Sequence, residues 1–275
     1  MAPLLRTPTT AARHRAGTVA SLAAAAALTA CASGGMVQGS IRDPDTASRI
    51  RVAMAAEASG QLDTALSMYA AAANAAPNDV DAQSRYASML ARLGQPEEAE
   101  QVLTRALQRR PDDPVLLTAL GQLRLRTGAA ADAIALFDRV LARRPSDAAA
   151  LNSRGVALDL LGRHAEAQQA YRAVQAANPT DIPSANNLAL SLMLDGRAEE
   201  AVPILASLSR RNGAPPRVVN NLGIAQAAVG NRGAALATLR GRIEDGDLES
   251  IVAGLMTAPP HTPAEPSAGD GSRNG

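Results

Sequence analysis

Small and bulky apolar residues recur along residues 46–245 with the spacing of α-helices. An alanine returns every 34 residues, and four positions later, one helical turn on, comes a bulky residue that shares its buried face. The bulky positions are Tyr69, Leu103, Phe137, Tyr171, Leu205 and Leu239. This phase predicts that the three aromatic members pack in a core rather than form an aromatic ligand site.

Helix-breaking and capping residues follow the same spacing. The prolines are Pro77, Pro111, Pro145 and Pro179, and two residues after each of them comes an aspartate. Proline ends one helix, and the aspartate is placed to cap the free N–H groups of the next. Glycines stand at Gly60, Gly94, Gly128, Gly162, Gly196 and Gly230, where a chain reversal between two helices needs a left-handed residue. The sequence therefore contains an internal repeat of two helices.

Small residues also mark the first helix of each unit, at Ala53, Ala87, Gly121, Gly155, Ala189 and Gly223. With these marks, and most openly in NNLALSLMLDGRAEEA (186–201) and NNLGIAQAAVGNRGAA (220–235), the chain resembles the tetratricopeptide repeat family. The resemblance implies an all-α fold, a right-handed α-solenoid of about six helix pairs over residues 46–256, in which stacking hides the apolar faces. Two departures are the missing first-helix tryptophan and the missing closing proline of the fifth unit, which predicts an irregular junction there.

The ends of the chain differ from the repeats. Residues 247–256 are expected to form a helix that caps the solenoid, as its exposed end requires. Residues 257–275 are rich in proline, glycine, serine and charge, so we expect a disordered tail.

Composition narrows the possible functions. Aromatic residues make up only 1% of the chain and the net charge is +1, which favours helix and offers no general field for nucleic acid. Histidines His14, His164 and His261 lie far apart, and no catalytic or metal-binding motif is present. We expect no enzymatic activity, no cofactor, no metal and no small-molecule substrate. His164, just after a turn glycine, is expected to be exposed and inert.

The N-terminus has the organisation of an export signal. Three arginines and no acid precede an uncharged stretch, residues 16–41, which contains LTAC with Cys31, the single cysteine of the chain. LTAC resembles the lipobox of bacterial lipoproteins, which implies a signal peptide over residues 1–30, a lipid on Cys31 and a flexible tether over 31–45. A plain secretory signal and an uncleaved anchor remain as alternatives. Because Ala32 rather than aspartate follows the cysteine, an outer-membrane protein facing the periplasm is favoured.

The family resemblance also implies a concave groove lined by the second, fifth, ninth and twelfth residues of each unit, with the thirteenth nearby. At the fifth position stands a row of amides, which either grips a partner's backbone or is exposed or caps its own helices: Asn152, Asn186 and Asn220. Neighbouring Asn187 and Asn221 are expected to be structural. The ninth position holds Gln122, Val156, Leu190 and Ile224, which predicts a more apolar docking surface in the C-terminal half. Arg92 and Arg126 share the thirteenth position and either pair with an acidic partner or form a solvated face.

The combination of LTAC, about six units and the two stretches quoted above resembles the TadD-type lipoproteins of tight-adherence (Tad/Flp) pilus assembly. That resemblance implies a membrane-anchored scaffold whose partners are a secretin or pilus components. The alternatives are a general envelope scaffold or assembly chaperone, for example in another secretion system, cytochrome maturation or polysaccharide export, an enzyme with a repeat domain, and a cytosolic regulator.

Overall fold

The structure is a computed structural model that describes residues 45–242 and 245–257. The predicted signal peptide, Cys31, the tether up to residue 44 and the tail beyond residue 257 lie outside the described residues. Within the described ranges the chain is helical and contains no strand. No helix in this part of the chain combines the length and the apolarity needed to cross a bilayer.

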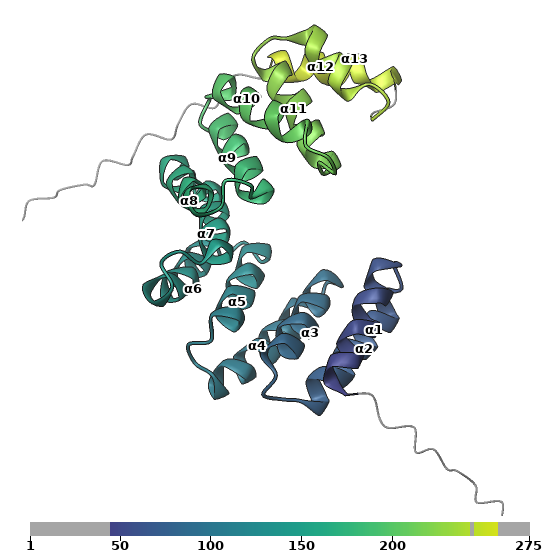
Figure 1. The fold of residues 1–275 in the computed structure, drawn as a ribbon, viewed down its shortest axis with the longest axis vertical. Helices are drawn as coiled ribbons and strands as arrows, with labels where there is room; N and C mark the ends of the chain where they lie inside the picture. The colour runs from purple at the N-terminus through teal and green to yellow at the C-terminus, as the bar shows by residue number, and fades with distance from the viewer. Residues whose placement is uncertain (1–44, 243–244, 258–275) are drawn as a thin grey trace, which may run out of the picture. The chain divides into compact units, whose positions relative to one another are not determined.

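Six helix pairs follow one another and a single helix closes the series (Figure 1). The pairs are α1 (Thr46–Ala58) with α2 (Leu62–Ala75), α3 (Val80–Arg92) with α4 (Pro96–Arg109), α5 (Pro114–Arg126) with α6 (Ala130–Arg143), α7 (Ala148–Leu160) with α8 (His164–Ala177), α9 (Ile182–Leu194) with α10 (Ala198–Ser209), and α11 (Pro216–Ala228) with α12 (Arg232–Leu239). The predicted all-α solenoid of about six helix pairs is confirmed. From α3 to α9, each first helix contacts its own partner, the second helix of the preceding pair and the next first helix.

Each of the first five pairs begins at a capping aspartate. The Asp147 carboxylate accepts a hydrogen bond from the backbone N–H of Ala150 at 3.0 Å, and the other four cap in the same way. The sixth pair begins at Pro215, whose side chain makes no cap, after a turn through Gly213. This is the irregular junction that the missing proline predicted.

Close approach of the two helices of a pair explains the small residues of the first helix. A Cβ atom added to Gly121 would lie 2.5 Å from a ring carbon of Phe137 on the second helix. The equivalent atom on Gly223 would lie 2.4 Å from Cγ of Leu239. Carbon atoms that are not bonded to each other do not come this close. Glycine at these positions therefore allows the two helices of the pair to approach each other as closely as they do.

Each helix pair leaves one apolar face uncovered, and the neighbouring pair buries that face. One core cluster runs continuously from Ala133 in the third pair to Ala225 in the sixth. At the C-terminal end, α13 (Asp245–Thr257) packs Leu248 and Val252 against the last pair. The stretch for which the sequence predicts a capping helix therefore lies in α13.

Candidate functional site

A groove with a volume of about 330 Å³ lies along the first helices of the second, third and fourth pairs. Seven of its lining residues occupy the second, fifth and ninth positions of their units: Asp81, Ser84, Ser88, Val115, Thr118, Gln122 and Ala149. Gln122, a predicted groove residue, is exposed and donates from Nε2 to Ser153 Oγ of the next first helix at 3.4 Å. The other six were not singled out from the sequence, although the position rule selects them.

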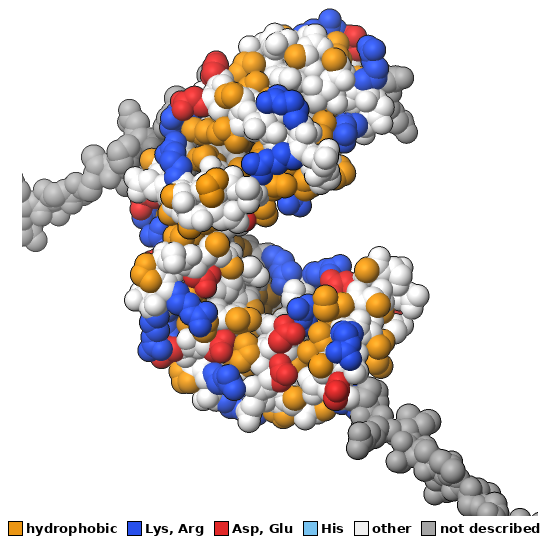
Figure 2. Space-filling view, in the orientation of Figure 1, with side chains coloured by type: hydrophobic (Ala, Val, Ile, Leu, Met, Phe, Trp, Pro, Cys, Tyr) orange, Lys and Arg blue, Asp and Glu red, His pale blue; other side chains and the backbone are white. Residues whose placement is uncertain are grey.

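The walls of this groove carry hydroxyl groups and charges of both signs. Ser88 and Thr118 make no side-chain hydrogen bond to another described residue. Arg85 is held by Asp81, with Nε 2.7 Å from the carboxylate, and Arg144, which also lines the groove, has no ion pair in the described part of the chain. Figure 2 shows charged side chains of both signs among hydrophobic ones on the face in view. Such walls offer donors and acceptors to a peptide backbone together with fixed charges for its side chains.

The asparagines lie differently from the predicted row. Asn187 Nδ2 donates to Asn152 Oδ1 at 3.1 Å, and Asn221 Nδ2 donates to Asn186 Oδ1 at 2.9 Å, so these amides tie α7 to α9 and α9 to α11. Asn186 is only 3% exposed and also contacts Asn187 at 3.5 Å. Asn220 is exposed and outside this chain of amides.

This arrangement corrects the predicted ladder, because the amides bond to asparagines of the neighbouring first helix instead of forming a free row. The hydrogen bonds therefore join the fifth position of one unit to the sixth position of the next. Asn186 is buried and hydrogen-bonded within the fold, so it is not accessible to a partner. Asn187 and Asn221 have the structural role expected of them. Of the predicted row, Asn220 and the half-buried Asn152 keep some access to a partner.

The two predicted arginines differ in their surroundings. Arg92 forms an ion pair with Glu57 of the first unit, and Glu57 also accepts a hydrogen bond from the Tyr69 hydroxyl at 2.9 Å. Arg126 has no ion pair in the described part of the chain. Burial lowers the pKa of Arg126, and the positive charge of Arg92 lowers it further. Arg92 is therefore paired within the fold, whereas Arg126 has no counter-charge among the residues that the structure describes.

The predicted apolar positions of the C-terminal half are partly covered. Val156, Leu190 and Ile224 are half-buried. More apolar surface is presented one turn further on, where Leu160 is 62% and Leu194 is 43% exposed. These two leucines occupy the thirteenth position, where Arg92 and Arg126 stand in the earlier units, so this row changes from basic to apolar along the solenoid.

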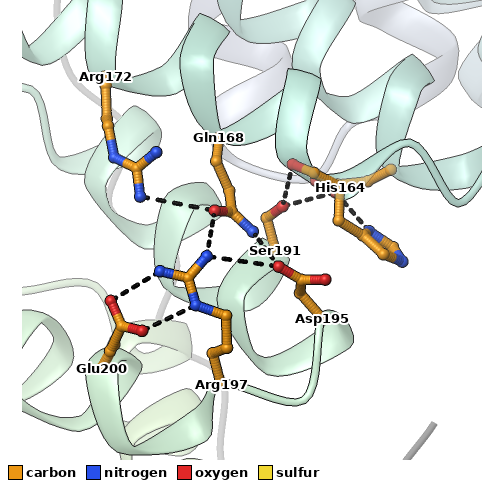
Figure 3. A network of polar contacts seen from close by, with 8 residues as sticks. His164, Gln168, Arg172, Ser191, Asp195, Arg197 and Glu200 are labelled. Atoms are coloured by element: carbon orange, nitrogen blue, oxygen red, sulfur yellow. Dashed lines mark hydrogen bonds and ion pairs between the residues drawn. The ribbon is translucent and has the colours of Figure 1, made fainter. Parts of the chain in front are cut away.

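A polar network joins the fourth and fifth pairs (Figure 3). Asp159 at the end of α7 accepts from the Tyr171 hydroxyl at 2.9 Å and from Ser191 Oγ at 2.6 Å. Nδ1 of His164 lies 2.9 Å from the same carboxylate, and the His164 side chain is only 18% exposed. The expectation of an exposed, unengaged histidine is therefore wrong, because the turn folds His164 back onto Asp159, five residues earlier.

The second half of the network is centred on Arg197. Its guanidinium makes two hydrogen bonds to Glu200, at 2.7 and 2.9 Å, and a third to Gln168 at 2.9 Å, as Figure 3 shows. Gln168 is 1% exposed and donates to Asp195 at 3.0 Å. Hydrogen bonding from Arg197 lowers the pKa of Glu200. Every group in this network has a partner within the fold, so its role is to hold two pairs together.

Neither the groove nor the network resembles a metal centre. The described residues contain no group of three or more histidine, cysteine, aspartate or glutamate side chains placed to hold a metal ion.

Comparisons with known proteins agree with this geometry. Models of the tetratricopeptide repeat family match residues 56–123 and 118–182. The solved structure of PilW, described as a widely conserved type IV pilus biogenesis factor, is 21% identical with a TM-score of 0.65, and the match covers 76% of this chain and 98% of that one. PilF of Pseudomonas aeruginosa is 15% identical with a TM-score of 0.60, covering 76% of this chain and 96% of that one.

A tetratricopeptide repeat protein from Parabacteroides merdae is 19% identical with a TM-score of 0.55, and the match covers 77% of this chain and 90% of that one. At these identities the likeness establishes the fold. The comparison with curated proteins finds no match. Residues 56–182 are therefore tetratricopeptide repeats, and stacked helix pairs with the same 34-residue geometry continue on both sides of them.

Proposed function

We propose that this protein is a lipid-anchored, periplasm-facing scaffold for Flp/Tad-type pilus assembly, which holds a secretin or pilus component at the outer membrane. The observation that carries the proposal is the groove along α3, α5 and the start of α7, because its lining combines unpaired hydroxyl groups with charged side chains. Tetratricopeptide repeat proteins bind protein partners, and a groove of this kind suits an extended or helical segment.

The mechanism couples two binding events. A lipid on Cys31 would fix the protein to the bilayer, and the groove would take up a segment of the partner. Once the scaffold is anchored, a partner in the same membrane meets it at a high effective concentration, so modest groove contacts give firm capture. The protein's own residues perform no covalent chemistry in this scheme.

Two observations support a pilus role. The lipobox and the repeat stretches resemble TadD-type lipoproteins, and two of the structurally similar proteins, PilW and PilF, carry pilus names. The general envelope scaffold or assembly chaperone remains the alternative, since the same groove would serve another secretion, cytochrome-maturation or polysaccharide-export system.

Site-specific photo-crosslinking in living cells tests the proposal. A photoreactive residue at Ser88 or Thr118 lies in the groove, and one at Ala135 lies exposed on the second helix α6 as the matched control. We expect adducts with a secretin or pilus protein from the two groove sites and none from Ala135. Adducts with proteins of another envelope system would establish the alternative. Equal labelling from all three sites would contradict the proposal that the groove binds the partner.

A further inference from the structure

A second pocket lies away from the groove, where α2, α3 and α4 meet. Its volume is about 170 Å³, and its polar lining comes from Asn74, Gln83, Tyr86, Arg105 and Arg109. The two arginines stand one turn apart on α4, so both guanidinium groups reach the same pocket. No aspartate or glutamate lines it.

The two arginines are positioned but not neutralised. Arg105 Nε donates to the Gln101 carbonyl and Arg109 Nη1 to the Arg105 carbonyl, each at 3.2 Å, and neither has an ion pair in the described part of the chain. Nearby acids are engaged elsewhere. Asp79 caps α3 through the N–H of Ala82 at 3.0 Å, and the Glu100 carboxylate receives Arg124 Nη1 at 3.0 Å.

The next repeat shows what the equivalent pair of arginines binds. Arg139 and Arg143 stand 34 residues after Arg105 and Arg109, and both grip the carboxylate of Asp112, at 3.1 and 2.8 Å. Arg139 also donates to the Pro111 carbonyl at 2.9 Å. The residue 34 positions before Asp112 is Asn78, a neutral amide. The junction of α4 with the turn before α3 thus keeps the two cations found where α6 meets the turn before α5. It lacks the internal carboxylate that neutralises them there.

We propose that Arg105 and Arg109, with Tyr86 and Asn74, form a binding pocket for a carboxylate side chain of an acidic segment of a partner protein. The Tyr86 hydroxyl makes no hydrogen bond within the described residues, and it adds a neutral donor to the two guanidinium groups. Paired arginine N–H groups match the two oxygens of a carboxylate, and charge-assisted hydrogen bonds of this kind are the strong ones. The site is separate from the groove and independent of which partner occupies that groove.

Fluorescence anisotropy with a labelled glutamate-rich peptide tests the pocket on the full chain, with a glutamine-rich peptide as the neutral probe. We expect the glutamate peptide to bind. Asn78→Asp should weaken it about tenfold, because it restores the internal carboxylate, and Arg105→Gln with Arg109→Gln should weaken it similarly. Arg210→Gln changes the net charge as much as Asn78→Asp, at a remote arginine with no ion pair in the described residues, and should leave affinity unchanged.

Arginine Nε–H resonances in NMR spectra locate the binding. The signals of Arg105 and Arg109 should shift on addition of the glutamate peptide and stay unmoved in the Asn78→Asp chain. Unchanged affinity in Asn78→Asp would overturn the proposal, and that variant is safe for folding because the next turn already carries Asp112 beside Asp113. Stronger competition by inorganic phosphate than by acetate would also overturn it, and would make the pocket a phosphate site.

Discussion

A Cβ atom on Gly155 would lie 2.5 Å from Cε1 of Tyr171, the aromatic residue on the facing helix of its pair. Gly155→Ala therefore forces the pair apart or turns the ring. We expect it to destabilise the protein by about 1–3 kcal/mol, although alanine by itself favours a helix by about 1 kcal/mol. Urea unfolding followed by circular dichroism measures the change.

The matched control is Gly254→Ala in α13. A Cβ atom there meets nothing within 4 Å, so only the helix preference acts and stability should rise by up to about 1 kcal/mol. If both glycines gave the same change, close helix approach would not be the reason for glycine at position 155.

Asn186→Ala is expected to cost about 1–3 kcal/mol, because it removes a buried amide and the half-buried Nδ2 of Asn221 loses its acceptor. Asn220→Ala, at an exposed neighbour one unit on from Asn186, should change stability by less than about 0.5 kcal/mol. Thermal unfolding of both variants makes the comparison. Equal small effects would show that the asparagine chain contributes nothing to stability.

Alkaline pH should unfold the protein through Tyr171. Burial raises the pKa of Tyr171, and the charge of Asp159 and its hydrogen bond raise it further. Because the folded-state pKa lies above that of the unfolded chain, at about 10, the contribution is complete below pH 10 and is lost as the pH rises beyond it. The sequence has no lysine, so in the described part of the chain tyrosines are the groups that titrate in this range.

Tyr171→Phe distinguishes the contribution of the Tyr171 hydrogen bond from the effect of Tyr171 ionisation. At about pH 8 its Tm should be lower than that of the unaltered chain, since the hydrogen bond to Asp159 is gone. From about pH 9 to about pH 11 its Tm should fall less steeply, since one raised pKa has been removed. A slope equal to that of the unaltered chain would assign the alkaline transition to other groups, such as Tyr69, whose pKa burial also raises.

Membrane attachment depends on Cys31 if the lipobox resemblance holds. Cys31→Ser should abolish palmitate labelling, move the protein from the membrane to the soluble fraction and prevent pilus formation, because no acyl chains remain to hold it. Ser33→Ala, two residues on, should leave all three unchanged. A soluble Cys31→Ser protein that still supports pili would separate anchoring from function.

The sequence predicted the fold in detail because each of its marks has one geometric cause. An aspartate before a helix finds N–H donors wherever the helix begins, and a glycine between two helices takes a positive φ, as Gly162 does at 71°. These effects are local, so the 34-residue spacing was enough to place all six pairs. The sequence marked Gly155 as a small position of the first helix, and the structure shows that Tyr171 packs against it.

The groove residues were predicted less well than the fold, because they depend on how neighbouring first helices pack against one another. The resemblance placed Asn186 in the groove, but only the packing of neighbouring first helices decides that Asn187 meets Asn152. Choosing residues by chemical type also drew attention to the asparagines and away from Ser88 and Thr118. The position rule alone would have found both hydroxyls.

The polar network around Asp159 affects the order in which the helix pairs unfold. In a row of repeats, each pair is stabilised only by itself and its immediate neighbours, so separation begins where coupling is weakest. The junction of the fourth and fifth pairs has a shared apolar cluster and a carboxylate that receives donors from two other helices. Pairs four and five should therefore melt as one cooperative block, and the ends of the row should fray before its centre.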